Sequence, residues 1–343
     1  MPRPPATKSS HRAARRGATT APEDGAAALA APLEAWFAGA ARDLPWRRER
    51  SGWRALVSEL MLQQTQVARV VERFGPFLAR FPTPEALATA PEDEVLALWQ
   101  GLGYYRRARL LQSAARAIVE RHAGEVPADR ASLEALPGVG RYTAGAVASI
   151  AFGRREAIVD GNVARVLQRI FAREGSSADR AVTGWAWAEA TRFVEAAERP
   201  GLANEALMEF GATVCTPAAP RCQGCPLAGG CLARRTGRTD AIPAPKPRAA
   251  RRALVLVSAR IERTDGALLL EQRPATGLWA RLWQPPTAES DDGAALSAAA
   301  AASLLGLSGI GGPTLESVGE IPFQTTHRDV RFVVFQGRVR GDG

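Results

Sequence analysis

The spacing of apolar and polar positions divides the chain into a long helical part and a later part of mixed structure. Residues 53–81 form one amphipathic run at helical spacing, which we expect to break near Gly75–Pro76. Further helix starts, marked by capping residues or proline, follow in residues 83–90, 91–102 and 106–124. Because β-branched alternation is scarce between Leu33 and Leu232, this part is predicted to be all-α.

A change of composition marks the start of a second part. Residues 233–252 are rich in Pro and Arg and have no apolar period, as expected of a linker. Residues 253–261 and 267–273 are predicted strands, joined as a hairpin across the turn between them. A predicted helix at 293–307 and a strand at 329–339 complete a domain of α+β class.

The chain is therefore predicted to be multidomain. Its expected segments are a disordered basic tail at 1–28, a helical domain at 29–232, the linker at 233–252 and the α+β domain at 253–343.

The formal net charge of +9 and the pI near 10.3 favour a polyanionic partner such as nucleic acid. Lysine occurs only at Lys8 and Lys246, so the excess is arginine, part of which a biased coding composition would also explain. No apolar run approaches the roughly 18 residues of a membrane span, and the first residues lack the apolar core of a secretory signal. We expect a cytoplasmic protein, with no membrane partner.

The four cysteines gather in one short segment. They are separated by six, two and five residues and lie at Cys215, Cys222, Cys225 and Cys231. A disulfide framework is not expected in a large cytosolic domain that can bury its own core. Four thiolates in one loop predict metal ligation, by zinc or by an iron–sulfur cluster, and the spacing alone leaves that choice open.

Residues 136–145, with the sequence LPGVGRYTAG, combine a glycine turn with a helix start. Gly138 and Gly140 permit positive φ angles and expose backbone N–H groups, and the following helix adds its positive dipole end. This arrangement suits a phosphate, and it equally suits a plain helix–turn–helix connection. Tyr142 stands directly beside the turn.

Two carboxyls are candidates for acid–base chemistry. Glu59 has Leu56 and Leu62 as its neighbours three residues away, so burial would raise its pKa and suit it to deliver a proton, although a solvent-edge position is the simpler alternative. Asp160 precedes Gly161 and a new helix, where it would be the N-cap with a pKa kept low by the dipole. A protonated and an ionised carboxyl together are the pair that cleaves glycosidic bonds.

These segments, taken in order, resemble motifs of the helix–hairpin–helix DNA glycosylases of the endonuclease III superfamily, and within it the adenine DNA glycosylases. The matching stretches are LPWR at 44–47, SELMLQQTQV at 58–67, GLGYYRRAR at 101–109, LPGVGRYTAGA at 136–146, VDGNVARVL at 159–167 and the cysteine loop within 211–232. The resemblance implies a [4Fe–4S] cluster, structural and DNA-facing, held by the four cysteines. It also implies a monomer that acts on double-stranded DNA containing A:8-oxoguanine or A:G mispairs, in a bacterial nucleoid.

Site residues follow from the same resemblance. Glu59 resembles the general acid that protonates adenine at N7, and Asp160 the carboxylate that stabilises the oxocarbenium sugar, with Tyr142 and Asn162 orienting them. The DNA contacts that it implies are the wedge Tyr104, the intercalating Gln64, the hairpin residues Gly138 and Gly140, and an adenine pocket of Arg42, Leu44, Trp46, Arg47 and Glu205.

The second domain resembles the Nudix-like module of this family, which recognises 8-oxoguanine. Thr326 and His327 match its lesion-probing loop, whereas the Thr–Thr–His sequence leaves the contact made by Thr325 open. The glutamate-rich helix of Nudix hydrolases is absent, so the module is expected to bind without hydrolysing.

Strand nicking by glycosylases uses a lysine Schiff base, and none is available between Lys8 and Lys246. The sequence therefore predicts a glycosylase that removes a base without cutting the strand. The alternatives are a non-catalytic DNA-binding module, with salt-sensitive binding and no base release, and a bifunctional endonuclease III-like enzyme that acts on oxidised pyrimidines.

Overall fold

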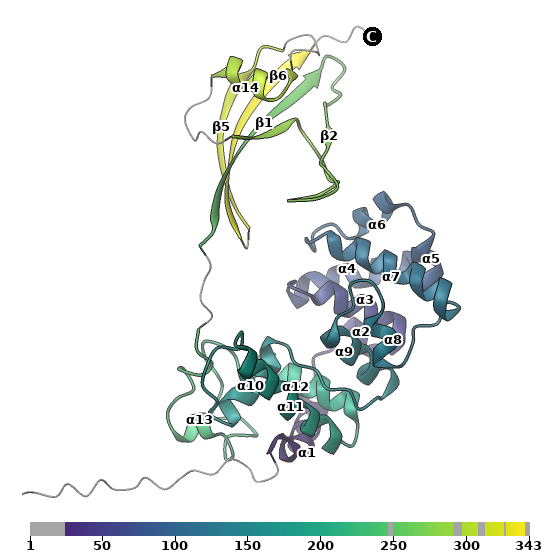
Figure 1. The fold of residues 1–343 in the computed structure, drawn as a ribbon, viewed down its shortest axis with the longest axis vertical. Coiled ribbons are helices and arrows are strands. Elements are labelled where there is room, and N and C mark those ends of the chain that lie inside the picture. The colour runs from purple at the N-terminus through teal and green to yellow at the C-terminus, as the bar shows by residue number, and fades with distance from the viewer. Residues whose placement is uncertain (1–24, 246–249, 291–296, 308–312, 326, 340–343) are drawn as a thin grey trace, which may run out of the picture. The chain divides into compact units, whose positions relative to one another are not determined.

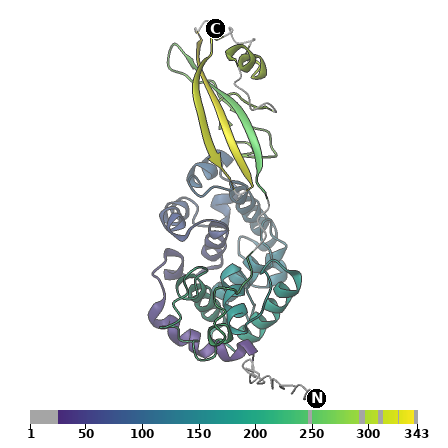
Figure 2. The same cartoon turned by 90° about the vertical axis from the view of Figure 1, so that its left-hand side faces the viewer.

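The computed structural model describes residues 25–245, 250–290, 297–307, 313–325 and 327–339, which belong to two compact units, Met1–Lys246 and Pro247–Gly343. The first 24 residues of the predicted basic tail lie outside the described residues. Residues 25–28 begin a 3-10 helix, η1 (Gly25–Leu29). Each unit is described by itself below (Figures 1 and 2).

The first unit is helical, as predicted. Its helices are α1 (Ala30–Ala40), α2 (Pro45–Arg48), α3 (Gly52–Leu62), α4 (Val67–Arg80), α5 (Pro84–Ala88), α6 (Glu92–Leu98), α7 (Arg106–His122), α8 (Arg130–Glu134), α9 (Arg141–Phe152), α10 (Gly161–Ile170), α11 (Arg180–Ala196), α12 (Pro200–Thr213) and α13 (Leu232–Arg235). Within the described residues, no helix is long and apolar enough to cross a membrane.

Two separate hydrophobic cores hold the helical unit together. The first gathers α3 to α9 around large buried side chains such as Leu56, Phe77 and Trp99. The second gathers α1, α10, α11 and α12 around side chains such as Leu167 and Phe210. Figure 1 shows the corresponding groups of helices, with α2 to α9 in one group and α1 with α10 to α13 in the other.

The predicted break at Gly75–Pro76 is wrong, because α4 continues through both residues. Both residues lie on the exposed side of the helix. Proline has no N–H, and the carbonyl that this N–H would have bonded can be hydrated there. Phe74 and Phe77 hold the opposite side of the helix in the core. The chain breaks instead after Leu62, at a turn in which Gln64 has a φ of 54°.

The proposed linker at 233–252 is not a free connection over its first half. Ile242 is buried in the second core, and the Ala244 N–H donates to the carbonyl of Gly175 at 3.1 Å. The stretch up to residue 245 is therefore packed on the helical unit. A high content of proline and arginine did not indicate, in the sequence, that part of this stretch is buried.

The second unit is built on a mixed sheet. The strands are β1 (Arg252–Arg263), β2 (Glu271–Gln272), β3 (Trp283–Gln284), β4 (Thr287–Ser290), β5 (Glu316–Gln324) and β6 (Arg328–Val339). The main sheet has the order β4-β1-β6-β5, in which β1 and β6 are parallel and the outer pairs are antiparallel. The predicted helix is α14 (Ala298–Leu304), which buries Ala301 against the sheet core.

The predicted hairpin from 253–261 to 267–273 forms only at its turn. The Arg263 N–H donates to the Ala267 carbonyl, and a single bridge joins Glu262 to Leu268. Strand β4 occupies the antiparallel edge of β1 from Val255 to Ser258, so the chain beyond the turn leaves β1, and β2 pairs with β3 instead.

Candidate active site

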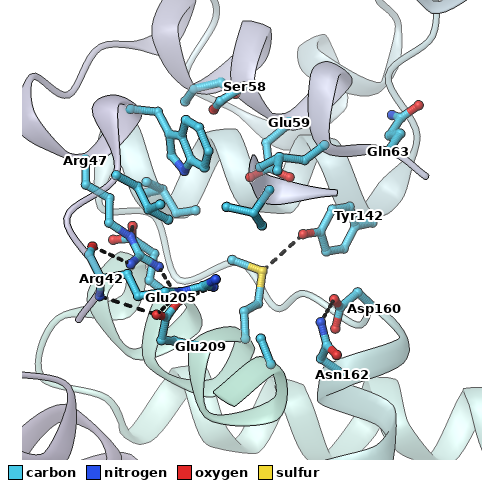
Figure 3. A pocket seen from close by; sticks show the side chains of 18 of the residues that line it. Arg42, Arg47, Ser58, Glu59, Gln63, Tyr142, Asp160, Asn162, Glu205 and Glu209 are labelled. Atoms are coloured by element: carbon cyan, nitrogen blue, oxygen red, sulfur yellow. Dashed lines mark hydrogen bonds and ion pairs between the residues drawn. The ribbon is translucent and has the colours of Figure 1, made fainter. Parts of the chain in front are cut away.

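A cavity of about 370 Å³ in the helical unit brings most of the predicted site residues together (Figure 3). This volume lies within the usual range of small-molecule pockets. Its walls come from the segment around α2, from α3, from the starts of α9 and α10, and from α12. The predicted residues that line it are Arg42, Leu44, Trp46, Arg47, Glu59, Gln64, Tyr142, Asp160, Asn162 and Glu205.

Glu59 lies in the middle of α3 with only 6% of its surface exposed, which excludes the solvent-edge alternative. Burial raises the pKa of Glu59 to about 7. A hydrogen bond from the Tyr142 hydroxyl lowers that pKa, whereas the charges of Asp160 and Glu205 raise it. A carboxyl with a pKa near neutrality is suited to donate a proton in general acid catalysis.

Asp160 is the N-cap of α10, as predicted. Its Oδ1 accepts the Val163 N–H at 2.7 Å, and its Oδ2 accepts the side-chain amide of Asn162 at 3.0 Å. The expected low pKa is wrong, because burial raises the pKa of Asp160 above its ordinary value against these two donors and the charge of Arg165. The effect of desolvation on the pKa of Asp160 is therefore larger than the opposite effect of its position at the helix start.

Tyr142, on the first turn of α9, stands beside both carboxyls. In Figure 3 the side chains of Glu59, Tyr142 and Asp160 point into the same space. Burial, followed by the charges of Glu59 and Asp160, raises the pKa of the Tyr142 hydroxyl well above 10. The hydroxyl therefore stays protonated, and it also lies 3.1 Å from the Met208 sulfur.

Two buried glutamates of α12 organise the other wall of the cavity. Glu205 accepts the Arg47 Nε at 3.0 Å. Glu209 accepts Arg47 Nη2 at 3.0 Å and Arg42 Nη2 at 2.9 Å. Burial alone would raise the pKa of Glu209, but the hydrogen bonds and charges of Arg42 and Arg47 lower it. This carboxyl is therefore ionised at neutral pH, whereas Glu59 has a pKa of about 7.

Sequence reasoning missed Glu209, Arg50 and Met208. Arg50 forms a second ion pair with Glu205, at 2.5 Å. A signal for Glu209 was present, because Glu205 and Glu209 are four residues apart and share one face of α12. The arginine wall itself depends on the fold, which brings residues 42–50 against α12.

The glycine turn lies between α8 and α9 and does not line the cavity. Gly138 has a φ of 78°, and a Cβ there would lie 2.7 Å from Cβ of Leu110, so glycine is required. Gly140 does not use positive φ, because it is the extended N-cap of α9 with a φ of −96°. A Cβ added at Gly140 would have no atom within 4 Å, so the site has room for a side chain.

The two residues expected to enter DNA share an unusual backbone. Gln64 and Tyr104 have φ angles of 54° and 48°, a conformation that side chains other than glycine rarely adopt. Gln64 lines the cavity, and Tyr104 lies outside its lining with 47% of its surface exposed. Strained backbone of this kind is concentrated at functional sites.

The four cysteines surround a second, smaller cavity. Burial raises the pKa of Cys225 to about 11, with further contributions from the nearby thiols of Cys215, Cys231 and Cys222. Among the described residues, no three His, Cys, Asp or Glu side chains are placed to hold a single metal ion.

Two buried arginines of α10 fasten the cysteine loop. Arg165 donates to the Cys215 carbonyl through Nε at 2.8 Å, and through Nη2 to the Asn162 side chain at 2.9 Å. Arg169 donates to the Thr216 carbonyl at 2.7 Å and lies 3.4 Å from the Cys215 sulfur.

Of the two residues predicted to probe the lesion, Thr326 lies outside the described residues, and His327 belongs to the second unit. The Thr325 hydroxyl accepts the Arg328 N–H at 3.0 Å and closes the turn, and its contact with a damaged base stays a prediction. The structure does not relate these residues to the cavity of the helical unit.

Comparison with known proteins agrees with this geometry. Residues 57–187 match the HhH-GPD superfamily of base excision DNA repair proteins, and residues 257–343 match the NUDIX domain. The chain is 48% identical to the human adenine DNA glycosylase over 212 residues, which are 59% of this chain and 39% of the human protein. It is 45% identical to the Mycobacterium tuberculosis (strain H37Rv) adenine DNA glycosylase over 197 residues, or 57% of this chain and 64% of the relative.

Solved structures extend the comparison. A thermostable thymine-DNA glycosylase matches with a TM-score of 0.56 at 28% identity, over 62% of this chain and 97% of that one. A non-covalent endonuclease III–DNA complex matches with a TM-score of 0.51 at 27% identity, over 60% and 92% of the two chains.

The fold and the matched segments combine a helical core of HhH-GPD type with a NUDIX-like C-terminal domain. Over residues 57–187, the helical unit is similar to the HhH-GPD superfamily of base excision DNA repair proteins. The matched region spans 39% of the human relative and 64% of the mycobacterial one.

Proposed function

We propose that this protein is a DNA glycosylase that removes adenine mispaired with 8-oxoguanine or guanine, by hydrolysis of the N-glycosidic bond and without cutting the strand. The observation that carries this proposal is the cavity in which Glu59, with a pKa of about 7, faces the N-capping Asp160. The relatives named adenine DNA glycosylase support the choice of base.

In the proposed reaction the target adenine leaves the helical stack and enters the cavity, which costs least at a mispair. The Glu59 carboxyl protonates N7 of adenine, so that the base departs as a neutral leaving group. Tyr142, which stays protonated, holds the Glu59 carboxyl. The arginine-paired Glu205 and Glu209 form the opposite wall.

Departure of the base leaves a cationic sugar. Asp160 stabilises this oxocarbenium ion, and the Asn162 amide and Val163 N–H favour the ionised form of its carboxyl. Water then adds to C1′ and an abasic site remains. Because the described cavity lining contains no lysine, Schiff-base cleavage of the strand has no nucleophile there.

The cysteine loop fits a [4Fe–4S] cluster held by Cys215, Cys222, Cys225 and Cys231. Such a cluster would be structural and would order the loop toward DNA, and the proposed reaction uses no electron from it. The buried Arg165 and Arg169 would then compensate the charge of the ligating thiolates.

The proposed function is tested by single-turnover release of adenine from a duplex that contains A opposite 8-oxoguanine. The unmodified protein should release adenine, and Glu59→Gln and Asp160→Asn should each lower the rate by more than about 100-fold. Asp129→Asn is the matched control, because Asp129 caps α8 in the same way outside the cavity.

Three outcomes would point elsewhere. Normal rates in both carboxyl variants would end the proposal, and salt-sensitive binding without base release would favour a DNA-binding module. Release of thymine from G:T in place of adenine would favour the chemistry named for the thymine-DNA glycosylase. Strand cleavage without alkali would show a bifunctional enzyme.

A further inference from the structure

Arg107 is a buried cation without a carboxylate partner. It lies in the first turn of α7 with 7% of its surface exposed, and no ion pair reaches it within the described residues. Burial lowers the pKa of Arg107 to about 10, so the guanidinium is still charged at neutral pH. A desolvated charge persists only where other groups compensate it.

Five hydrogen bonds provide that compensation, and they come from three segments. Nη1 donates to the carbonyls of Leu60 at 2.7 Å and Met61 at 2.8 Å. Both are among the last carbonyls of α3, which lack helical partners and carry the negative end of the helix dipole. Glu59 directly precedes these two residues in the sequence.

The other bonds reach the two strained turns. Nη2 donates to the Thr65 hydroxyl at 2.8 Å, next to Gln64, and to the carbonyls of Leu102 and Gly103, both at 3.1 Å, next to Tyr104. The Thr65 hydroxyl in turn donates to the Leu102 carbonyl at 3.2 Å. One guanidinium therefore ties both turns to the end of the helix that carries Glu59.

Arg107 also contacts the ring of Tyr104. The guanidinium carbon of Arg107 lies 5.5 Å from its ring centroid and 5.6 Å from that of the buried Trp99. A cation at this distance from the ring is attracted to its π face, even though much of Tyr104 is exposed.

We propose that Arg107 is a positioning residue that keeps the Gln64 turn and the Tyr104 turn at a fixed spacing, so that both side chains enter the DNA duplex together. The proposal rests on the proposed function for the identity of the DNA partner. It assigns Arg107 no contact with DNA or with the reacting base. A planar fork is needed to serve five acceptors in three segments, which lysine with its single compact ammonium does not provide.

The test measures the affinity of the full chain for two duplexes, one intact and one with a tetrahydrofuran abasic analogue opposite 8-oxoguanine. A wedge that fills the stack favours the second duplex, and no base has to be released. Arg107→Lys should lower this preference about tenfold, equivalent to about 1.4 kcal/mol. Tyr104→Ala should lower it to a similar extent.

The double variant separates positioning from general stability. If Arg107 acts through the two turns, Arg107→Lys combined with Tyr104→Ala should lose less preference than the sum of the two single losses. Arg116→Lys is the matched control. Arg116 also lies on α7 and donates to a backbone carbonyl, that of Ala88, but it lies away from both turns. It should leave the preference unchanged.

Additive losses in the double variant, or an equal loss in Arg116→Lys, would overturn the proposal. Should Arg107→Lys fail to fold, Thr65→Val removes the hydroxyl between the turns and must reduce the preference in its place. A protein that shows the Arg107 effect but releases no adenine would contradict the proposed function alone. Normal adenine release with an unchanged preference in Arg107→Lys would contradict this inference alone.

Discussion

The side-chain amide of Asn162 donates a hydrogen bond of 3.0 Å to Oδ2 of Asp160. The Asn162 carbonyl oxygen accepts from Arg165, which also donates to the Cys215 carbonyl. The orientation of Asp160 is thus fixed through a chain of hydrogen bonds that continues to the cysteine loop.

Removing this donor should change the acidic side of the pH profile. Asn162→Ala takes away a hydrogen bond that lowers the pKa of Asp160, so that pKa rises further. The rate of adenine release, which needs ionised Asp160, should then begin to fall at a higher pH than in the unmodified protein. Single-turnover rates across pH measure this shift. Asn204→Ala, which removes a buried amide bonded to Ser149, should leave the acidic limb in place.

The decline of the rate of adenine release at alkaline pH should reflect the loss of the proton from Glu59. Because its proton is lost with a pKa of about 7, the rate of adenine release should fall above that pH. Tyr142→Phe removes a hydrogen bond that lowers this pKa, and the fall should move to higher pH. Tyr105→Phe provides the control, since Tyr105 lies outside the cavity lining. An unchanged alkaline limb in Tyr142→Phe would show that another group sets it.

Ionisation of the buried Glu59 should also lower the free energy of unfolding at high pH. Its pKa is about 7 in the folded chain against an ordinary 4.5, so its favourable contribution is complete below pH 4.5 and is lost as pH rises through 7. Relative to the unmodified protein, Glu59→Gln should therefore gain up to about 3 kcal/mol in unfolding free energy between pH 4.5 and 8. Urea unfolding at the two pH values measures the gain. Glu120→Gln, on the exposed side of α7, should show no such change.

The cysteine loop should lose its metal when one thiol is replaced. Cys225→Ser removes a half-buried thiol from the shared cavity, and the purified variant should contain little iron or sulfide and unfold at a lower temperature. Iron, sulfide and zinc analysis of both proteins measures this. Stoichiometric zinc in the unmodified protein, with no iron, would contradict the proposed cluster.

The carboxyl on α3 illustrates what the sequence could reveal. Leu56 and Leu62 near Glu59 indicated burial and a raised pKa, with a solvent-edge position as the simpler alternative, and capping rules placed Asp160 at the start of α10. The dipole argument failed for Asp160 because a sequence shows the helix start and not how far the side chain is removed from water.

Contacts between distant segments account for what the sequence did not show. Arg107 looks like an ordinary arginine of an amphipathic helix, and only the fold brings the end of α3 within its reach. The pairing of β1 depended in the same way on competition, because β4 took the edge that the predicted hairpin needed. The helix continued through Pro76 because two phenylalanines anchor its other face.

Glu59 and Asp160 stand on helices that belong to different hydrophobic cores. Each core can therefore remain intact while the gap between the carboxyls widens or narrows. A substitution where the two helix groups meet, which shifts one of them slightly, is expected to change this gap and the proposed base release while both cores stay packed. For the proposed reaction, a variant that folds normally can therefore still fail to release the base.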